Sequence, residues 1–179
     1  ASSGRYPLWM IACLVLAVAV ALTGKVARAQ EGYPQRKDTP VNDYAKLLTV
    51  DDAADTWMLL ADLERATGIE AIVVTIDSIV YYDTGDETVE AFATNLFNAW
   101  SVGDKERNDG VLILVSVKDR AVRIELGSGL RGYSSDMQSV IDEHMLPSFE
   151  RGDYSSGIRE GVQAVVDTLA DVALPEHTP

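Results

Sequence analysis

The chain has few of the residues that build disulfide frameworks or soft-metal centres. Among its 179 residues, Cys13 is the one cysteine, and His144 and His177 are the two histidines. One cysteine cannot form a disulfide within the chain, and two histidines supply zinc sites and histidine-based catalytic triads poorly. Any metal bound here would therefore be a hard ion with oxygen ligands, and we expect no organic cofactor.

Basic residues are also scarce, with 15 Lys and Arg against 28 Asp and Glu. Five of these basic residues and one of the acidic residues lie within the first 37 positions, so the remainder holds 10 basic and 27 acidic residues and a net charge of −17. A domain this acidic repels nucleic acid and anionic lipid. It could attract cations or a basic face of another protein.

An apolar run, Leu8–Leu22, lies near the start of the chain and is followed by an Ala27-Arg28-Ala29 site. Residues 1–30 therefore read as a signal peptide cleaved after Ala29 or as an uncleaved membrane anchor, and residues 31–40 as a polar linker. The distribution of basic residues alone would place the domain in the cytoplasm. The signal-like order favours export, giving a periplasmic domain anchored in the inner membrane by this helix, or a secreted one if Ala29 is cut.

Hydrophobic periodicity predicts a small α/β sandwich with a mixed sheet. The predicted helices cover about 50–67, 86–100, 135–145 and a segment from about 154, and the strands cover 70–77, 111–117 and 121–126. In the first helix, Ala53, Trp57, Leu60 and Ala61 form the expected core stripe, and Pro147 is expected to end the third. The last two strands form a hairpin across the Lys118–Arg120 turn.

Three carboxylates are candidates for one cation site. Asp109 precedes the strand at 111–117, Asp136 opens the helix after the hairpin, and Asp43 precedes the first helix. The topology predicts that they gather at one end of the sheet, with Glu125 nearby, where a bound cation would offset their repulsion. Each also has a structural interpretation: a turn for Asn108-Asp109-Gly110, a helix-dipole contact for Asp136, and a turn or cap for Asp43.

Several segments, in order, resemble the TPM-domain family, which is linked to photosystem repair and has acid phosphatase activity assigned to some members. The matching segments are VNDYAKLL, TGIEAIVVTIDS, WSVG, NDGVLILVS, RIELGSGLRG and PSFERGDYSSGI. The resemblance implies a TPM-like domain over 41–173, followed by a tail at 174–179. It also implies an acidic cavity that holds a divalent ion, often calcium, at Asp43, Asp109 and Asp136. The YYDTGDE segment departs from the usual short, glycine-bearing link.

Two classes of function follow. The first is an extracytoplasmic accessory subunit that is anchored in the membrane through Leu8–Leu22 and stabilises or helps assemble a larger membrane complex. The family resemblance makes a photosynthetic reaction-centre complex the leading candidate. The alternative is a metal-dependent, acid phosphatase-like enzyme or a calcium-binding periplasmic domain, in which Asp43, Asp109 and Asp136 hold the ion.

Overall fold

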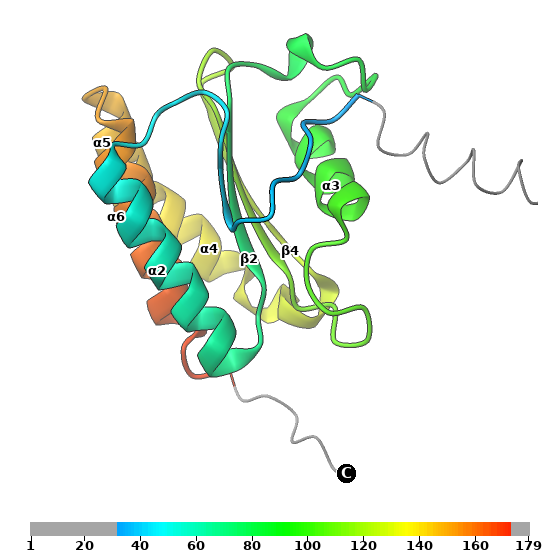
Figure 1. Cartoon of the computed structure of the whole chain (residues 1–179), viewed down its shortest axis with the longest axis vertical. Coiled ribbons are helices and arrows are strands. Elements are labelled where there is room, and N and C mark those ends of the chain that lie inside the picture. The colour runs from blue at the N-terminus through cyan, green and yellow to red at the C-terminus, as the bar shows by residue number, and fades with distance from the viewer. Residues whose placement is uncertain (1–31, 173–179) are drawn as a thin grey trace, which may run out of the picture.

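Four strands form one mixed sheet with helices on both of its faces (Figure 1). The computed structural model describes residues 32–172. The strands are β1 (Val41–Asp43), β2 (Ala71–Ile76), β3 (Val111–Ser116) and β4 (Ala121–Leu126), in that order across the sheet. The helices are α2 (Val50–Thr67), α3 (Val89–Trp100), α4 (Ser134–Val140), α5 (Leu146–Glu150) and α6 (Tyr154–Leu169). The predicted α/β sandwich is thereby confirmed for the described residues.

The burial of the two central strands, β2 and β3, explains why helices cover both faces of the sheet. Every residue of β2 and β3 is buried, as expected for apolar strands that are covered on both faces. Helix α3 packs on one face of the sheet and the other four helices pack on the opposite face (Figure 1). Strands β1, β2 and β3 run parallel, and β4 runs antiparallel to β3, as the predicted hairpin requires.

Strand β1 is an addition to the predicted sheet. It has three residues and pairs in parallel with β2, so that Val41 lies opposite Val73 and Asp43 opposite Thr75. A three-residue strand with one apolar side chain gives no periodic signal, so the sequence did not reveal it. Its direction decides where Asp43 lies.

The core stripe of α2 differs from the predicted one. The buried residues are Thr56, Leu60, Leu63 and Thr67, whereas Trp57 is 49% exposed. Two of these buried residues are threonines, which a hydrophobicity pattern does not mark as core residues. The Thr67 hydroxyl donates a hydrogen bond to the carbonyl of Leu63 at 2.7 Å. The predicted ends are confirmed: Thr49 caps the first turn, and Gly68, with φ of 71°, ends the helix.

The helical segment after β4 also corrects the prediction. Helix α4 passes into a π-helical turn, η3 (Ile141–Met145), and the helical backbone then continues through α5. Pro147 does not end the helix, because it lies in the first turn of α5, where its missing N–H costs nothing. The short 3₁₀ segments are η1 (Ile79–Tyr81) and η2 (Ser128–Tyr133).

Residues 32–40, expected to form a linker, pack against the folded body. The Tyr33 ring contacts Phe92 at a centroid distance of 5.1 Å. The Trp100 indole donates to the Pro34 carbonyl at 3.0 Å, and Arg36 donates to the Trp100 carbonyl at 2.9 Å. The predicted signal or anchor segment, with Leu8–Leu22 and Ala29, lies outside the described residues. Within residues 32–172, no helix is long and apolar enough to cross a membrane.

Candidate functional site

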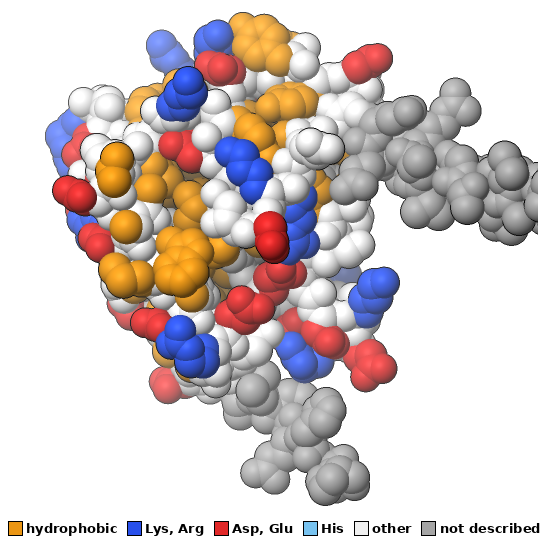
Figure 2. Space-filling model, in the orientation of Figure 1, with side chains coloured by type: hydrophobic (Ala, Val, Ile, Leu, Met, Phe, Trp, Pro, Cys, Tyr) orange, Lys and Arg blue, Asp and Glu red, His pale blue; other side chains and the backbone are white. Residues whose placement is uncertain are grey.

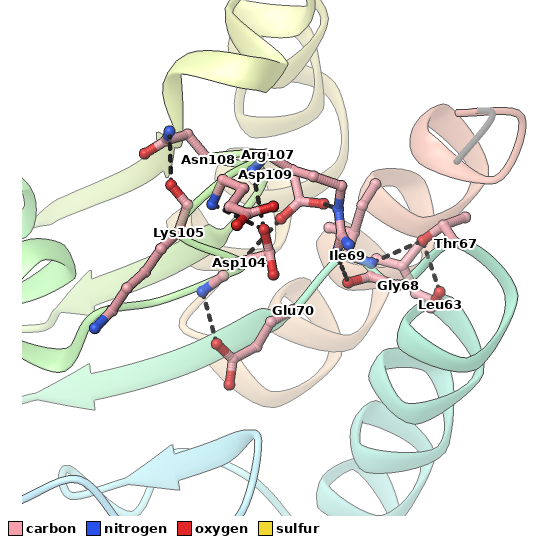
Figure 3. Close-up of polar contacts among 12 residues, drawn as sticks. Leu63, Thr67, Gly68, Ile69, Glu70, Asp104, Lys105, Arg107, Asn108 and Asp109 are labelled. Atoms are coloured by element: carbon pink, nitrogen blue, oxygen red, sulfur yellow. Dashed lines mark hydrogen bonds and ion pairs between the residues drawn. The ribbon is translucent and has the colours of Figure 1, made fainter. Parts of the chain in front are cut away.

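Asp109 lies at the entrance to β3 and is engaged by its own chain (Figure 3). Its side chain is 9% exposed and forms an ion pair with Nε of Arg107. Its other carboxylate oxygen accepts a hydrogen bond from the Asp104 amide at 3.1 Å. Arg107 also donates to the carbonyl of Gly68 at 2.9 Å, which ties this loop to the end of α2. The hydrogen bond to Asp109 raises the pKa of Arg107, so the guanidinium stays charged.

The loop around Asp109 is closed by backbone contacts that leave no room for side chains. Asn108 adopts a left-handed conformation with φ of 50°, and its carbonyl accepts from the Gly129 amide at 2.8 Å. A Cβ added to Gly127 would lie 2.1 Å from the Asn108 carbonyl oxygen. The turn itself covers residues 105–107, and Asn108-Asp109-Gly110 is the irregular segment that leads from this turn into β3. The Asp109 side chain holds the loop in place through Arg107 and the Asp104 amide.

Asp43 has a comparable role at the end of β1. Its two carboxylate oxygens accept from the amides of Leu47 and Leu48, each at 3.0 Å, and one of them also accepts from the Thr75 hydroxyl. These bonds shape the connection from β1 into α2. The predicted turn role of Asp43 agrees with this geometry.

The three predicted ligands do not share one end of the sheet. Asp43 lies opposite Thr75, which lies opposite Val115 in β3. Val115 is six residues beyond Asp109, and a strand advances about 3.3 Å per residue, so Asp43 and Asp109 lie about 20 Å apart along the sheet. The expectation that Asp43, Asp109 and Asp136 converge is therefore corrected. The cause is β1, whose parallel direction places its last residue at the far end.

Asp136 lies in the first turn of α4 and is exposed. An acidic residue at this position favours the helix dipole, which was its structural interpretation. Across residues 32–172, no three Asp, Glu, His or Cys side chains come together as a group that could hold a metal ion. These three residues thus do not fit one shared divalent ion. Binding of calcium or another cation by this chain stays a prediction.

Asp119 is a carboxylate that the sequence did not single out. In the turn between β3 and β4, it accepts from the hydroxyls of Ser78 at 2.7 Å and Ser116 at 2.6 Å, and from the Ile79 amide at 2.9 Å. Burial alone would raise the pKa of Asp119, but these three hydrogen bonds outweigh it and lower the pKa below its ordinary value. The sequence signal that could have identified Asp119 is an acidic residue in a tight turn directly after a buried strand.

The other feature that the sequence did not predict is an apolar surface on α2. Val50 is 87% exposed, Met58 50% and Trp57 49%. Figure 2 shows hydrophobic side chains gathered over this helix. With Ala54 between them, these residues recur at the spacing of one helix face, and we call them the α2 patch. Trp57 was expected in the core, so its exposure is what the sequence pattern missed.

Comparison with known proteins gives a family and a fold. The family model of the TPM domain matches residues 41–168. The solution structure of the N-terminal domain of a protein from P. gingivalis is 32% identical, covers 78% of this chain and 87% of its own, and superposes with a TM-score of 0.62. No curated protein matches this chain.

Two more distant solution structures share the fold. BA42 from the psychrophilic bacterium Bizionia argentinensis is 21% identical, covers 75% of this chain and 89% of its own, and has a TM-score of 0.59. The N-terminal domain of cg2496 from Corynebacterium glutamicum is 14% identical, and the match covers 82% of this chain and 93% of that domain, with a TM-score of 0.56. At these identities the likeness concerns architecture alone.

Proposed function

Because the chain belongs to the TPM-domain family, we propose that it is a non-catalytic accessory domain that docks on a larger membrane protein complex through the α2 patch. The single observation that carries this proposal is the exposure of Trp57 beside Met58 and Val50 on one helix face. Contiguous apolar side chains on a solvent-exposed surface, rimmed by polar residues, are typical of protein interaction sites.

The chemistry of the patch suits a protein partner. Tryptophan is enriched among the residues that carry most of the binding energy at interfaces. Two exposed carboxylates, Asp51 and Asp55, lie on the same helix beside the patch, whereas the exposed Asp62 is paired with Arg65. Charge complementarity therefore favours a partner with an apolar pocket and a basic rim.

Two acids at the ends of the sheet, the buried Asp109 and the half-buried Asp119, support a structural role for the rest of the domain. Asp109 and Asp119 each receive their hydrogen bonds from groups of their own chain. Both fasten loops beside the sheet. The domain in this proposal is a rigid body that presents one helix face.

The proposal places the domain in the periplasm, held at the inner membrane by Leu8–Leu22. An anchor raises the effective concentration of the domain near a membrane partner, so a docking face of modest area suffices. The family resemblance makes a photosynthetic complex the first partner to test.

The test is purification of the full-length chain from native membranes in mild detergent, as wild type, Trp57→Ala and Tyr81→Ala. Tyr81 is 62% exposed but lies in η1, away from α2, and serves as the matched aromatic control. We expect one membrane complex, in stoichiometric amount, with the wild type and Tyr81→Ala. The amount of complex recovered with Trp57→Ala should be at least about tenfold lower, because truncating a binding hot spot costs about 2 kcal/mol or more of binding free energy.

Mass spectrometry of the same samples reports whether residues 1–29 remain, and a melting curve shows that Trp57→Ala is folded. Equal recovery of the complex with Trp57→Ala and with the wild type would exclude docking through the α2 patch. Recovery of the wild type as a free, processed monomer would overturn the accessory-subunit proposal.

A further inference from the structure

Strand β4 forms one edge of the sheet, opposite β1. Its pairing with β3 places Glu125 opposite Leu112 and Arg123 opposite Leu114. The Gly127 amide donates to the Gly110 carbonyl at 2.9 Å, which fixes the alternation of hydrogen-bonded pairs. Arg123 and Glu125 therefore direct their backbone groups toward β3, and the residues between and beside them direct theirs away from the sheet.

The outward groups belong to Val122, Ile124 and Leu126. A surface hollow of about 290 Å³ is lined by all four residues from Arg123 to Leu126 and by Met137 and Ile141 on the neighbouring helical segment. Successive side chains of a strand point to opposite faces of a sheet, so a hollow that touches four consecutive residues follows the edge of the strand. Within residues 32–172 no strand pairs with this edge of β4, so it is open to a strand from another chain.

The charges on this edge are self-complementary. If a second β4 pairs antiparallel with the first and Ile124 lies at the two-fold axis, Arg123 of each copy lies opposite Glu125 of the other, and Val122 lies opposite Leu126. Arg123 and Glu125 already form a 3.2 Å ion pair within one chain. Two copies would join these pairs into an alternating network of four charges. Directly opposite unlike charges stabilise paired strands.

The same charges disfavour the neighbouring registers. A shift that moves the two-fold axis from Ile124 to Arg123 places arginine opposite arginine, and a shift to Glu125 places glutamate opposite glutamate. Like charges directly opposite destabilise a strand pair. The register about Ile124 is therefore selected by charge. It is also the one that pairs all three outward residues within the strand, because the other two place Leu126 opposite Arg120 of the turn or Val122 opposite Ser128 of η2.

We propose that this chain forms a symmetric dimer by antiparallel pairing of β4 with β4 of a second copy, which joins the two sheets into one. A two-fold contact of this kind closes on itself, so it does not extend into fibres. Pairing would also supply partners for the outward N–H and C=O groups. The α2 patch takes no part in this contact, so either proposal can fail without the other.

The test is a charge exchange on the full-length chain in mild detergent, with dimerisation followed by sedimentation across a concentration series. In a dimer, Arg123→Glu places two glutamates opposite each other, and Glu125→Arg places two arginines opposite each other. We expect each single variant to raise the dimer dissociation constant at least about tenfold, since two attractive cross-strand pairs become repulsive. The charge-matched control is Arg65→Glu on exposed α2, which should dimerise like the wild type.

Two complementary samples keep the test decisive if a single variant is destabilised. A mixture of Arg123→Glu with Glu125→Arg restores both opposite-charge pairs in a mixed dimer, and the double exchange in one chain restores them in a homodimer. Hydrogen exchange at the Val122, Ile124 and Leu126 amides should slow in every dimeric sample. A wild type that stays monomeric, a dimer unaffected by the single variants, or a mixture that does not associate would overturn the proposal.

Discussion

At the scale of single residues, the acids with the clearest contacts hold loops in place by accepting hydrogen bonds. Asp109 holds Arg107 and the Asp104 amide, and Asp43 holds two amides and a hydroxyl. Sequence alone could nominate these residues, because acids beside buried strands are candidates both for ion sites and for turns. It could not decide between the two, since the choice depends on donors such as Thr75 that are distant in sequence.

Replacing Asp109 with asparagine should lower the free energy of unfolding by about 1–3 kcal/mol, because Arg107 loses a partially buried charged partner. Urea unfolding measures the change. The matched control is Asp62→Asn, which removes an exposed helix ion pair with Arg65 and should cost less than about 0.5 kcal/mol.

Calcium distinguishes the fastener role of Asp109 from a ligand role. If Asp109 only fastens its loop, any change in melting temperature caused by calcium should be the same in Asp109→Asn as in the wild type. Stabilisation of the wild type by calcium that disappears in the variant would show that Asp109 is a ligand after all.

At the scale of elements, hydrogen bonds to acids join segments that are far apart in sequence. Asp52 on α2 accepts from the Ser155 hydroxyl and from Arg159 at 3.0 Å on α6. The hydrogen bond from Ser155 lowers the pKa of Asp52, against the opposing effect of burial. Asp119 similarly joins η1 to the hairpin turn.

This arrangement predicts a loss of stability in acid. A carboxyl whose pKa is lowered by folding contributes stability above the pKa of the unfolded chain, near 3.9, and loses that contribution as pH falls through the folded pKa. Asp119→Asn should therefore destabilise the domain at pH 7, and its difference from the wild type should shrink below about pH 4. Urea unfolding across pH measures both, with exposed Asp38→Asn as the control. A difference that stays constant with pH would contradict the role of Asp119.

Most elements could be predicted from periodicity, and the exceptions have physical causes. The buried strands β2 and β3 and the apolar faces of α3 and α6 give strong local signals. Strand β1 is too short for one, and the core face of α2 contains Thr56 and Thr67 in place of apolar residues. The helix continues past Pro147 because a new helical segment, α5, begins there after a π-helical turn, and no local pattern indicates that turn.

At the scale of the whole molecule, these exceptions decide where the carboxylates and the exposed apolar side chains lie. The direction of β1 separates Asp43 from Asp109, which removes the expected shared cation site. The shifted core stripe of α2 turns Trp57 outward, which creates the exposed apolar surface on which the docking proposal rests. Both outcomes depend on contacts between distant segments, so they follow from the fold and not from any motif.

The most direct test of docking through α2 is photocrosslinking in native membranes from position 58, with position 80 as the control. Met58 and Val80 are both well exposed, but Val80 lies on η1. We expect a crosslinker at position 58 to give one dominant adduct with a membrane protein, and the same group at position 80 to give at least about tenfold less. Equal yields from the two positions, or no adduct from position 58, would contradict the proposal that the α2 patch is the docking surface.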